Sequence, residues 1–271
     1  MATTNHPNLR LDKFLFSKNV LPDVLSDFIN KYGFAIIPEF LSTDETLFLS
    51  NQFNAVQNGE IEGIDEEKLA YRTTHYSFTK NVIKNKLNRN TGVHGFKHSS
   101  VIHKITFNSL LTHVVDKFYP SDCNYLYPSR YQFMDTFDYP PERKKRDHRL
   151  LPYDLHFDRQ QLLKFFFYTT NVTLDSGPLV AVPDERVLAK NKEIQKRHRL
   201  TDASWEEVDQ FLEIDESLEI PAVVPMGSLV ILDSDVPHRQ AQVRNNQRRK
   251  CMVIEAQTLE EAFYTKNIKI N

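Results

Sequence analysis

The second half of the chain is a succession of short apolar runs, each bounded by Pro, Gly or Asp. From residue 129 onward they read SRYQFMDTF, LLKFFFYTTNV, PLVAVP, EIPAVVP, GSLVILDS and KCMVIEAQT. Short runs rich in β-branched and aromatic residues that end at turn residues predict strands. Strands of this kind bury their apolar faces by closing into a sandwich or a barrel, so we expect an antiparallel β barrel over residues 129–271.

Residues 1–128 predict a mostly helical layer with one early strand. FLFSKNVLPDVLSDFINKY has helical spacing, GFAIIPEF reads as a strand, and the segment from Ser42 reopens as a helix, because Ser42 and Glu45 form a capping box. Residues 59–128 are otherwise polar and irregular, with one short helix at SLLTHVVDKFY. The charged segment at about 184–217 predicts a helical surface insertion. The expected fold is mainly β with flanking helices, in a single domain of residues 1–271.

Composition excludes several classes of protein. The formal net charge of −2 and the pI near 6.6 provide no general basic field, so nucleic acid is not an expected partner. No segment approaches the length of an apolar membrane span, and residues 1–14 lack the apolar core of a secretory signal. Two cysteines fit a reducing compartment. We expect a cytoplasmic monomer or homodimer that binds a small molecule rather than nucleic acid or membrane.

A candidate metal site lies just before the strongest apolar run. His156 and Asp158 are two residues apart, so in a strand they point to the same side, and His238 follows the GSLVILDSDVP segment. Two histidines and one carboxylate on one face of a metal ion leave three positions open, an arrangement diagnostic of non-heme Fe(II) oxygenases. A second strand begins about ten residues later with Arg248 and Arg249, and one of them can enter the same cavity.

These residues and their surroundings resemble the phytanoyl-CoA dioxygenase family of Fe(II)/2-oxoglutarate oxygenases. The resemblance covers GFAIIPEFLSTDE, the HFD motif, LKFFFYTTNVTLDSGPLVAVP, GSLVILDSDVPH and an arginine beyond the distal histidine. It implies a double-stranded β-helix core (a cupin-like jelly roll), iron held by His156, Asp158 and His238, and 2-oxoglutarate held by Arg249. Arg248 is the alternative if the register shifts by one residue.

The same resemblance implies the reaction. Fe(II), 2-oxoglutarate and dioxygen would hydroxylate an unactivated C–H bond of a small polar metabolite and release succinate and CO2, with ascorbate as a possible support. Related halogenases replace the aspartate by a small residue, so Asp158 favours hydroxylation without halide. The family often has a small hydroxyl residue where this chain has Gln240, and Gln240 can still donate to a carboxylate. Tyr131 or Gln132 can line the pocket, and strand alternation alone does not decide which of them faces inward.

Other readings remain open at this level. A cupin-like binding or sensing protein without turnover would keep the barrel and the metal, whereas a zinc hydrolase would not need the arginine. The basic run YPPERKKRDHRLLPYD (139–154) reads as a surface loop, as a lid at the cavity mouth that attracts an anionic or highly polar substrate, or as both. His75, His94, His98 and His103 fit no standard zinc spacing and are expected to be structural or to contact substrate.

Overall fold

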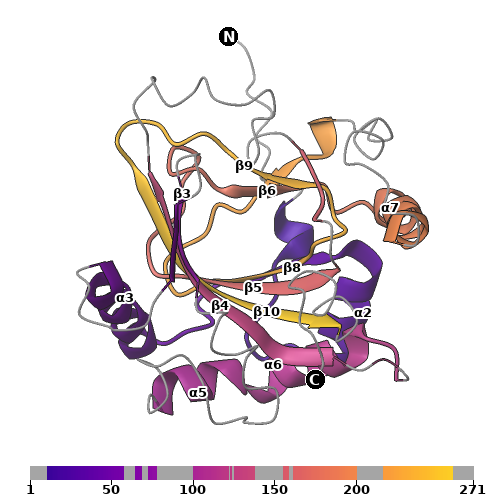
Figure 1. The fold of residues 1–271 in the computed structure, drawn as a ribbon, viewed down its shortest axis with the longest axis horizontal. Coiled ribbons are helices and arrows are strands. Elements are labelled where there is room, and N and C mark those ends of the chain that lie inside the picture. The colour runs from indigo at the N-terminus through magenta and orange to yellow at the C-terminus, as the bar shows by residue number, and fades with distance from the viewer. Residues whose placement is uncertain are drawn as a thin grey trace.

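Two antiparallel sheets face each other in the computed structural model, which describes residues 11–57, 65–68, 73–77, 100–121, 123, 125–137, 155–158, 161–199 and 216–258 (Figure 1). The large seven-stranded sheet has the order β1 (Phe34–Ile37), β8 (Leu229–Asp233), β5 (Leu162–Tyr168), β10 (Arg248–Thr258), β4 (Tyr125–Phe137), β3 (Thr73–Ser77) and β2 (Asp65–Lys68). The small sheet has the order β7 (Ile220–Pro221), β6 (Leu179–Ala181) and β9 (His238–Gln240). The predicted double-stranded β-helix is thereby confirmed.

Helices cover the outer face of the large sheet. Figure 1 shows α2 (Pro22–Tyr32), α5 (Ser100–Thr106) and α6 (Ser109–Phe118) beneath it, α3 (Thr43–Gln57) at one end, and α7 (Glu185–Arg199) at the other. Short 3-10 turns, η1 (Asp12–Phe14) and η3 (Glu216–Leu218), complete the described elements. Helix α2 begins with Pro22 and ends at Gly33, whose φ of 65° is the left-handed conformation that favours glycine at a helix C-terminus.

The central strands are largely apolar because both of their faces are buried. On β5, Phe165 and Phe167 pack against the helical layer, whereas Phe166 and Tyr168 belong to a second apolar cluster between the two sheets. All five residues of β8 are buried as well. Burial on two sides explains why these segments read as continuous apolar runs rather than as an alternating pattern. On β5, odd-numbered side chains therefore face the helices, whereas even-numbered side chains face the barrel interior.

Most predicted elements are confirmed. The strand β1, the helix α6 and the insertion helix α7 are present, although residues 200–215 of the predicted insertion lie outside the described residues. The capping box is formed: the Glu45 amide donates to Ser42 Oγ at 3.2 Å, and the Ser42 amide donates to Glu45 Oε2 at 2.9 Å.

Two predictions about the fold were wrong. Residues 59–128 are not irregular throughout, because β2 and β3 extend the large sheet beyond β4. Pairing with a distant strand, which local sequence does not encode, makes these polar segments extended. The HFD motif is also not part of a regular strand, since β5 begins only at Leu162.

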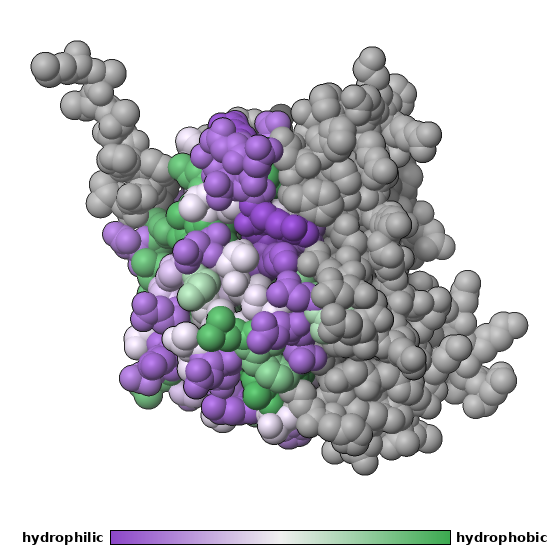
Figure 2. Space-filling model, turned by 90° about the vertical axis from the view of Figure 1, so that its left-hand side faces the viewer, coloured by the Kyte–Doolittle hydropathy of each residue, from purple (hydrophilic) through white to green (hydrophobic). Residues whose placement is uncertain are grey.

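The exposed apolar side chains and the helix lengths describe the surface of the molecule. On the face in Figure 2, hydrophilic and hydrophobic residues are interspersed. Among the described residues, the exposed large apolar side chains come from several parts of the chain, for example Leu47 on α3 and Phe107 just after α5. None of the described helices is long and apolar enough to span a bilayer.

Candidate metal centre

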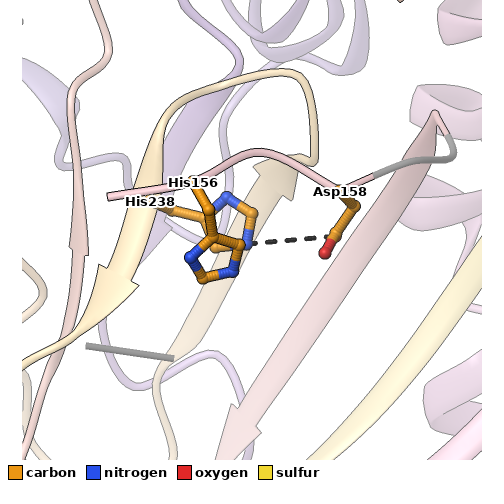
Figure 3. Close-up of side chains that lie close together, drawn as sticks. All are labelled: His156, Asp158 and His238. Carbon is orange, nitrogen blue, oxygen red and sulfur yellow. Dashed lines mark ion pairs between the residues drawn. The ribbon is translucent and has the colours of Figure 1, made fainter. Parts of the chain in front are cut away.

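The two candidate histidine ligands are joined through their backbones. His156 and His238 form an isolated antiparallel bridge: the His156 amide donates to the His238 carbonyl at 3.0 Å, and the His238 amide donates back at 2.7 Å. Their rings lie 4.6 Å apart between centroids (Figure 3). Residues 156 and 238 are thus brought together by a pairing between the chain before β5 and the start of β9.

A short buried loop, residues 233–237, positions the rest of the site. The Asp158 amide donates to the Ser234 carbonyl at 3.1 Å, and the Ser234 hydroxyl accepts from the Leu162 amide at 2.7 Å. The Val236 carbonyl lies 2.8 Å from His238 Nδ1. One loop therefore holds the backbone of one ligand and the ring of another, which is the kind of outer support that fixes metal ligands in proteins.

The three side chains converge on one point. A nitrogen or oxygen atom of each of His156, Asp158 and His238 lies within 4.8 Å of the others, and His238 Nε2 is 3.9 Å from Asp158 Oδ2 (Figure 3). Phe157, between the first two, is buried. Bonds of about 2.1 Å to one ion would place neighbouring ligand atoms about 3 Å apart, so the three side chains need to close in by only about 1–2 Å to share an ion. The convergence predicted from sequence is present, although it arises from a bridge rather than from a strand.

The protonation states suit metal binding. Burial and the neighbouring His156 lower the pKa of His238 to about 3, so its ring is neutral at neutral pH. Because a carbonyl can only accept, Nδ1 carries the proton given to Val236, and Nε2 is left with a lone pair facing Asp158. Burial raises the pKa of Asp158 and is the largest single effect, but Lys164, His238 and His156 together outweigh it, and the pKa falls to about 2. A neutral imidazole and an ionised carboxylate are the forms that bind a divalent metal.

A buried cation, Arg249, lies on the same interior face of the barrel. Arg249, only 3% exposed, directs Nη2 to Thr136 Oγ1 at 3.2 Å and to Gln240 Oε1 at 3.4 Å, and its guanidinium lies 6.0 Å from the Tyr168 ring centroid. Neither Arg249 Nε nor the Tyr168 hydroxyl has a hydrogen-bond partner within the described part of the chain. Buried donors of this kind favour an anionic ligand, and the guanidinium fork matches a carboxylate.

The neighbouring arginine points the other way. Arg248 forms a bidentate ion pair with the buried Asp135, with Nε 2.6 Å from Oδ1, and its side chain is half exposed. The register of β10 against β4 places Arg249 opposite Thr136 and Arg248 opposite Phe137, so the two arginines occupy opposite faces of the sheet. Of the two candidates, the structure turns Arg249 inward and Arg248 outward.

The other predicted pocket residues separate. Gln240 contacts Arg249, as described above. Tyr131 lies on the helix-facing side of β4, where its hydroxyl is 3.1 Å from Thr106 Oγ1 on α5, so it does not line the barrel interior. Gln132 pairs through its backbone with Val253, and its side chain lies outside the described residues.

The remaining histidine and basic-run predictions are largely untested. His94, His98 and the run 139–154 lie outside the described residues, as does the side chain of His75. His103 packs against Phe107 on α5, with ring centroids 4.7 Å apart.

Sequence reasoning missed three polar residues of the interior. Lys164 Nζ lies 2.5 Å from Asp158 Oδ2, and Tyr168 and Thr136 surround Arg249. Lys164 and Tyr168 lie within the run LLKFFFY, which the sequence pattern assigns to the core. The only sign of an inward polar face is that these two residues are four positions apart. The signal was present but weak.

Comparison with known proteins settles the family. The sequence profile of the phytanoyl-CoA dioxygenase (PhyH) family matches residues 29–251, which is most of the chain. The chain belongs to the PhyH family. Membership confirms the resemblance noted from the HFD motif and makes the protein a non-heme iron and 2-oxoglutarate-dependent oxygenase. A search of curated proteins found no significant match.

Solved structures share the PhyH fold at low sequence identity. HygX from Streptomyces hygroscopicus, crystallised with nickel and 2-oxoglutarate, is 12% identical with a TM-score of 0.51, covering 89% of this chain and 88% of that one. The carbocyclase SnoK from nogalamycin biosynthesis is 12% identical with a TM-score of 0.53, covering 89% and 86%. The epimerase SnoN of the same biosynthesis is 9% identical with a TM-score of 0.52, covering 87% and 81%. Similarity at this level shows the fold.

Proposed function

We propose that this PhyH protein is a dioxygenase that hydroxylates an unactivated C–H bond of a small polar metabolite and releases succinate and CO2. Iron would be held by His156, Asp158 and His238, and the distal carboxylate of 2-oxoglutarate by Arg249. The observation that carries the proposal is the convergence of three ligand side chains, one of them about 80 residues from the other two in the chain, within 4.8 Å of one another.

The donor set fits iron. Two imidazoles and one carboxylate form the facial set typical of non-heme Fe(II) oxygenases, and the neutral His238 and ionised Asp158 need no further proton loss to bind. When bound, iron would activate dioxygen, and the oxidation of 2-oxoglutarate would supply electrons for that activation. The 233–237 loop holds His238 and Asp158 in place, so the chain orients the ligands before the metal arrives.

The Arg249 pocket fits the cosubstrate. Arg249 Nε and the Tyr168 hydroxyl are buried donors without a partner among the described residues, and a carboxylate would satisfy both. The barrel interior around Arg249 is otherwise apolar, since Phe166, Cys251 and Val253 all belong to the interior cluster. These residues exclude water from the cosubstrate and strengthen the electrostatic contacts made to it.

The substrate class is inferred from proteins of the same fold and from the charges near the metal centre. Among proteins of this fold, HygX was crystallised with hygromycin B and SnoN with nogalamycin RO, which are small molecules. The charged pair Lys164–Asp158 beside the metal centre supports a polar substrate here as well. Hydroxylation is the outcome we propose because Asp158 occupies the position that a halide would need.

The proposal is tested by measuring succinate formed from 2-oxoglutarate with Fe(II), ascorbate and dioxygen. The wild-type protein should form succinate slowly even without substrate and faster with the correct one. His238→Ala should form none, while its circular dichroism spectrum stays that of the wild type. Absence of succinate from the wild-type protein with every candidate substrate would instead leave a binding or sensing protein.

A further inference from the structure

Lys164 is a charged side chain inside the barrel that the metal triad does not explain. It lies on the interior face of β5, its side chain is only 15% exposed, and its Nζ is 2.5 Å from Asp158 Oδ2. Placing an ammonium group in such surroundings costs free energy unless anionic groups face it. The position of Lys164 beside the metal centre therefore calls for a role beyond packing.

One oxygen atom of Asp158 serves two cations. Asp158 Oδ2, which Lys164 contacts, is also the oxygen 3.9 Å from His238 Nε2, so it faces the centre of the triad. A divalent ion held by the triad would compete with the ammonium group for this atom. Once the carboxylate shares its charge with such an ion, it attracts Lys164 less strongly, and the ammonium group becomes available to another anion.

The barrel interior carries a positive group at each end. Lys164 and Tyr168 lie four residues apart on the same face of β5, about 13 Å along the strand, and Tyr168 is beside Arg249. Phe166 and Val253 provide apolar walls between the two ends. A cation, an apolar stretch and a second cation complement a short dicarboxylate whose two acid groups are joined by methylenes.

We propose that Lys164 positions the cosubstrate by binding the carboxylate of 2-oxoglutarate that lies next to its keto group, while Arg249 binds the distal carboxylate. This inference rests on the proposed function and names a residue that the metal triad and the arginine do not include. It predicts that removal of the Lys164 charge has opposite effects on the two ligands. The affinity for metal rises because the competing cation is gone, and the affinity for 2-oxoglutarate falls because one acid group loses its partner.

The test uses the full chain and two titrations by calorimetry. Ni(II) is first titrated into metal-free protein, and 2-oxoglutarate is then titrated into the Ni(II)-saturated protein. Lys164→Gln should bind Ni(II) about threefold or more tightly and 2-oxoglutarate about tenfold or more weakly than the wild type. Lys164→Arg, which keeps the charge, should hold 2-oxoglutarate within about threefold of the wild type.

Lys250→Gln is the matched control. This variant removes the same charge from the same sheet. The Lys250 side chain, however, lies on the opposite face, where Nζ contacts Asn54 Oδ1 at 3.1 Å. Both affinities should stay at their wild-type values in this variant. Thermal unfolding of each variant shows whether it is folded, and Lys164→Arg keeps the test decisive if Lys164→Gln does not fold.

Each contrary result has a distinct meaning. If Lys164→Gln lowers both affinities, Lys164 merely supports Asp158 and the inference is wrong. Unchanged 2-oxoglutarate affinity in Lys164→Gln, or a tenfold loss in Lys164→Arg, also overturns it. Failure of the wild-type protein to bind Ni(II) at all would refute the metal assignment itself, which is the proposed function rather than this inference.

Discussion

Replacement of Arg249 by methionine tests the cosubstrate site most directly. Methionine keeps much of the length of the side chain but removes the charge and every donor. In the structure, Arg249 Nη2 has only two long contacts, at 3.2 and 3.4 Å, and Nε has none among the described residues, so the guanidinium can give a carboxylate two charge-assisted hydrogen bonds. Each is worth about 1.5–3 kcal/mol, and allowing for incomplete additivity we expect a loss of about 3–4 kcal/mol.

That loss corresponds to 2-oxoglutarate binding roughly 10²–10³-fold more weakly, since each 1.4 kcal/mol is about a factor of ten. Calorimetric titration of 2-oxoglutarate into the Ni(II)-loaded variant measures it. The affinity for Ni(II) should stay within about threefold of the wild type, because Arg249 does not contact the triad in the described structure.

Arg248→Met is the control for Arg249→Met. It removes the same group from the adjacent residue, but Arg248 pairs with the buried Asp135 on the opposite face. We expect this variant to keep its 2-oxoglutarate affinity and to lose about 1–3 kcal/mol of unfolding free energy in urea denaturation, because a buried carboxylate loses its guanidinium partner. If Arg248→Met instead abolishes 2-oxoglutarate binding and Arg249→Met does not, the register argument is refuted.

Three further variants probe the site and its support. His238→Ala should abolish the rise in melting temperature that Ni(II) causes in the wild type; a rise of equal size would show that the metal binds elsewhere. Tyr168→Phe removes one hydroxyl, so 2-oxoglutarate affinity should fall about fivefold, or ~1 kcal/mol, with little change in stability, and unchanged affinity in the same titration would place the hydroxyl outside the site. Gly33→Ala should lower the unfolding free energy by about 2–4 kcal/mol in urea denaturation, because φ is +65° and the added Cβ collides with Cγ2 of Val236; a loss below about 1 kcal/mol would show that the 233–237 loop yields easily.

The fold was predictable where local pattern and burial agree. The apolar runs that became β5, β8 and β10 are apolar on both faces because helices cover one side and the small sheet the other, so their strand character is evident from composition. The polar segments β2 and β3 were not predictable, because they are extended only through pairing with β4. Nor was the bridge between His156 and His238, which joins backbones about 80 residues apart.

The sequence by itself determined which functional groups are present. These are two histidines and an aspartate near the ends of strands, a pair of arginines that follows them in the chain, and the family pattern that surrounds them. Residue type and spacing are local properties, so they can be read along the chain. Only the tertiary structure decided that Arg249 faces the interior while Arg248 pairs with Asp135, and that Lys164 reaches Asp158. The reason is that successive residues of a strand point to opposite faces, so a shift of one position inverts every side chain, and register is set by pairing with distant strands.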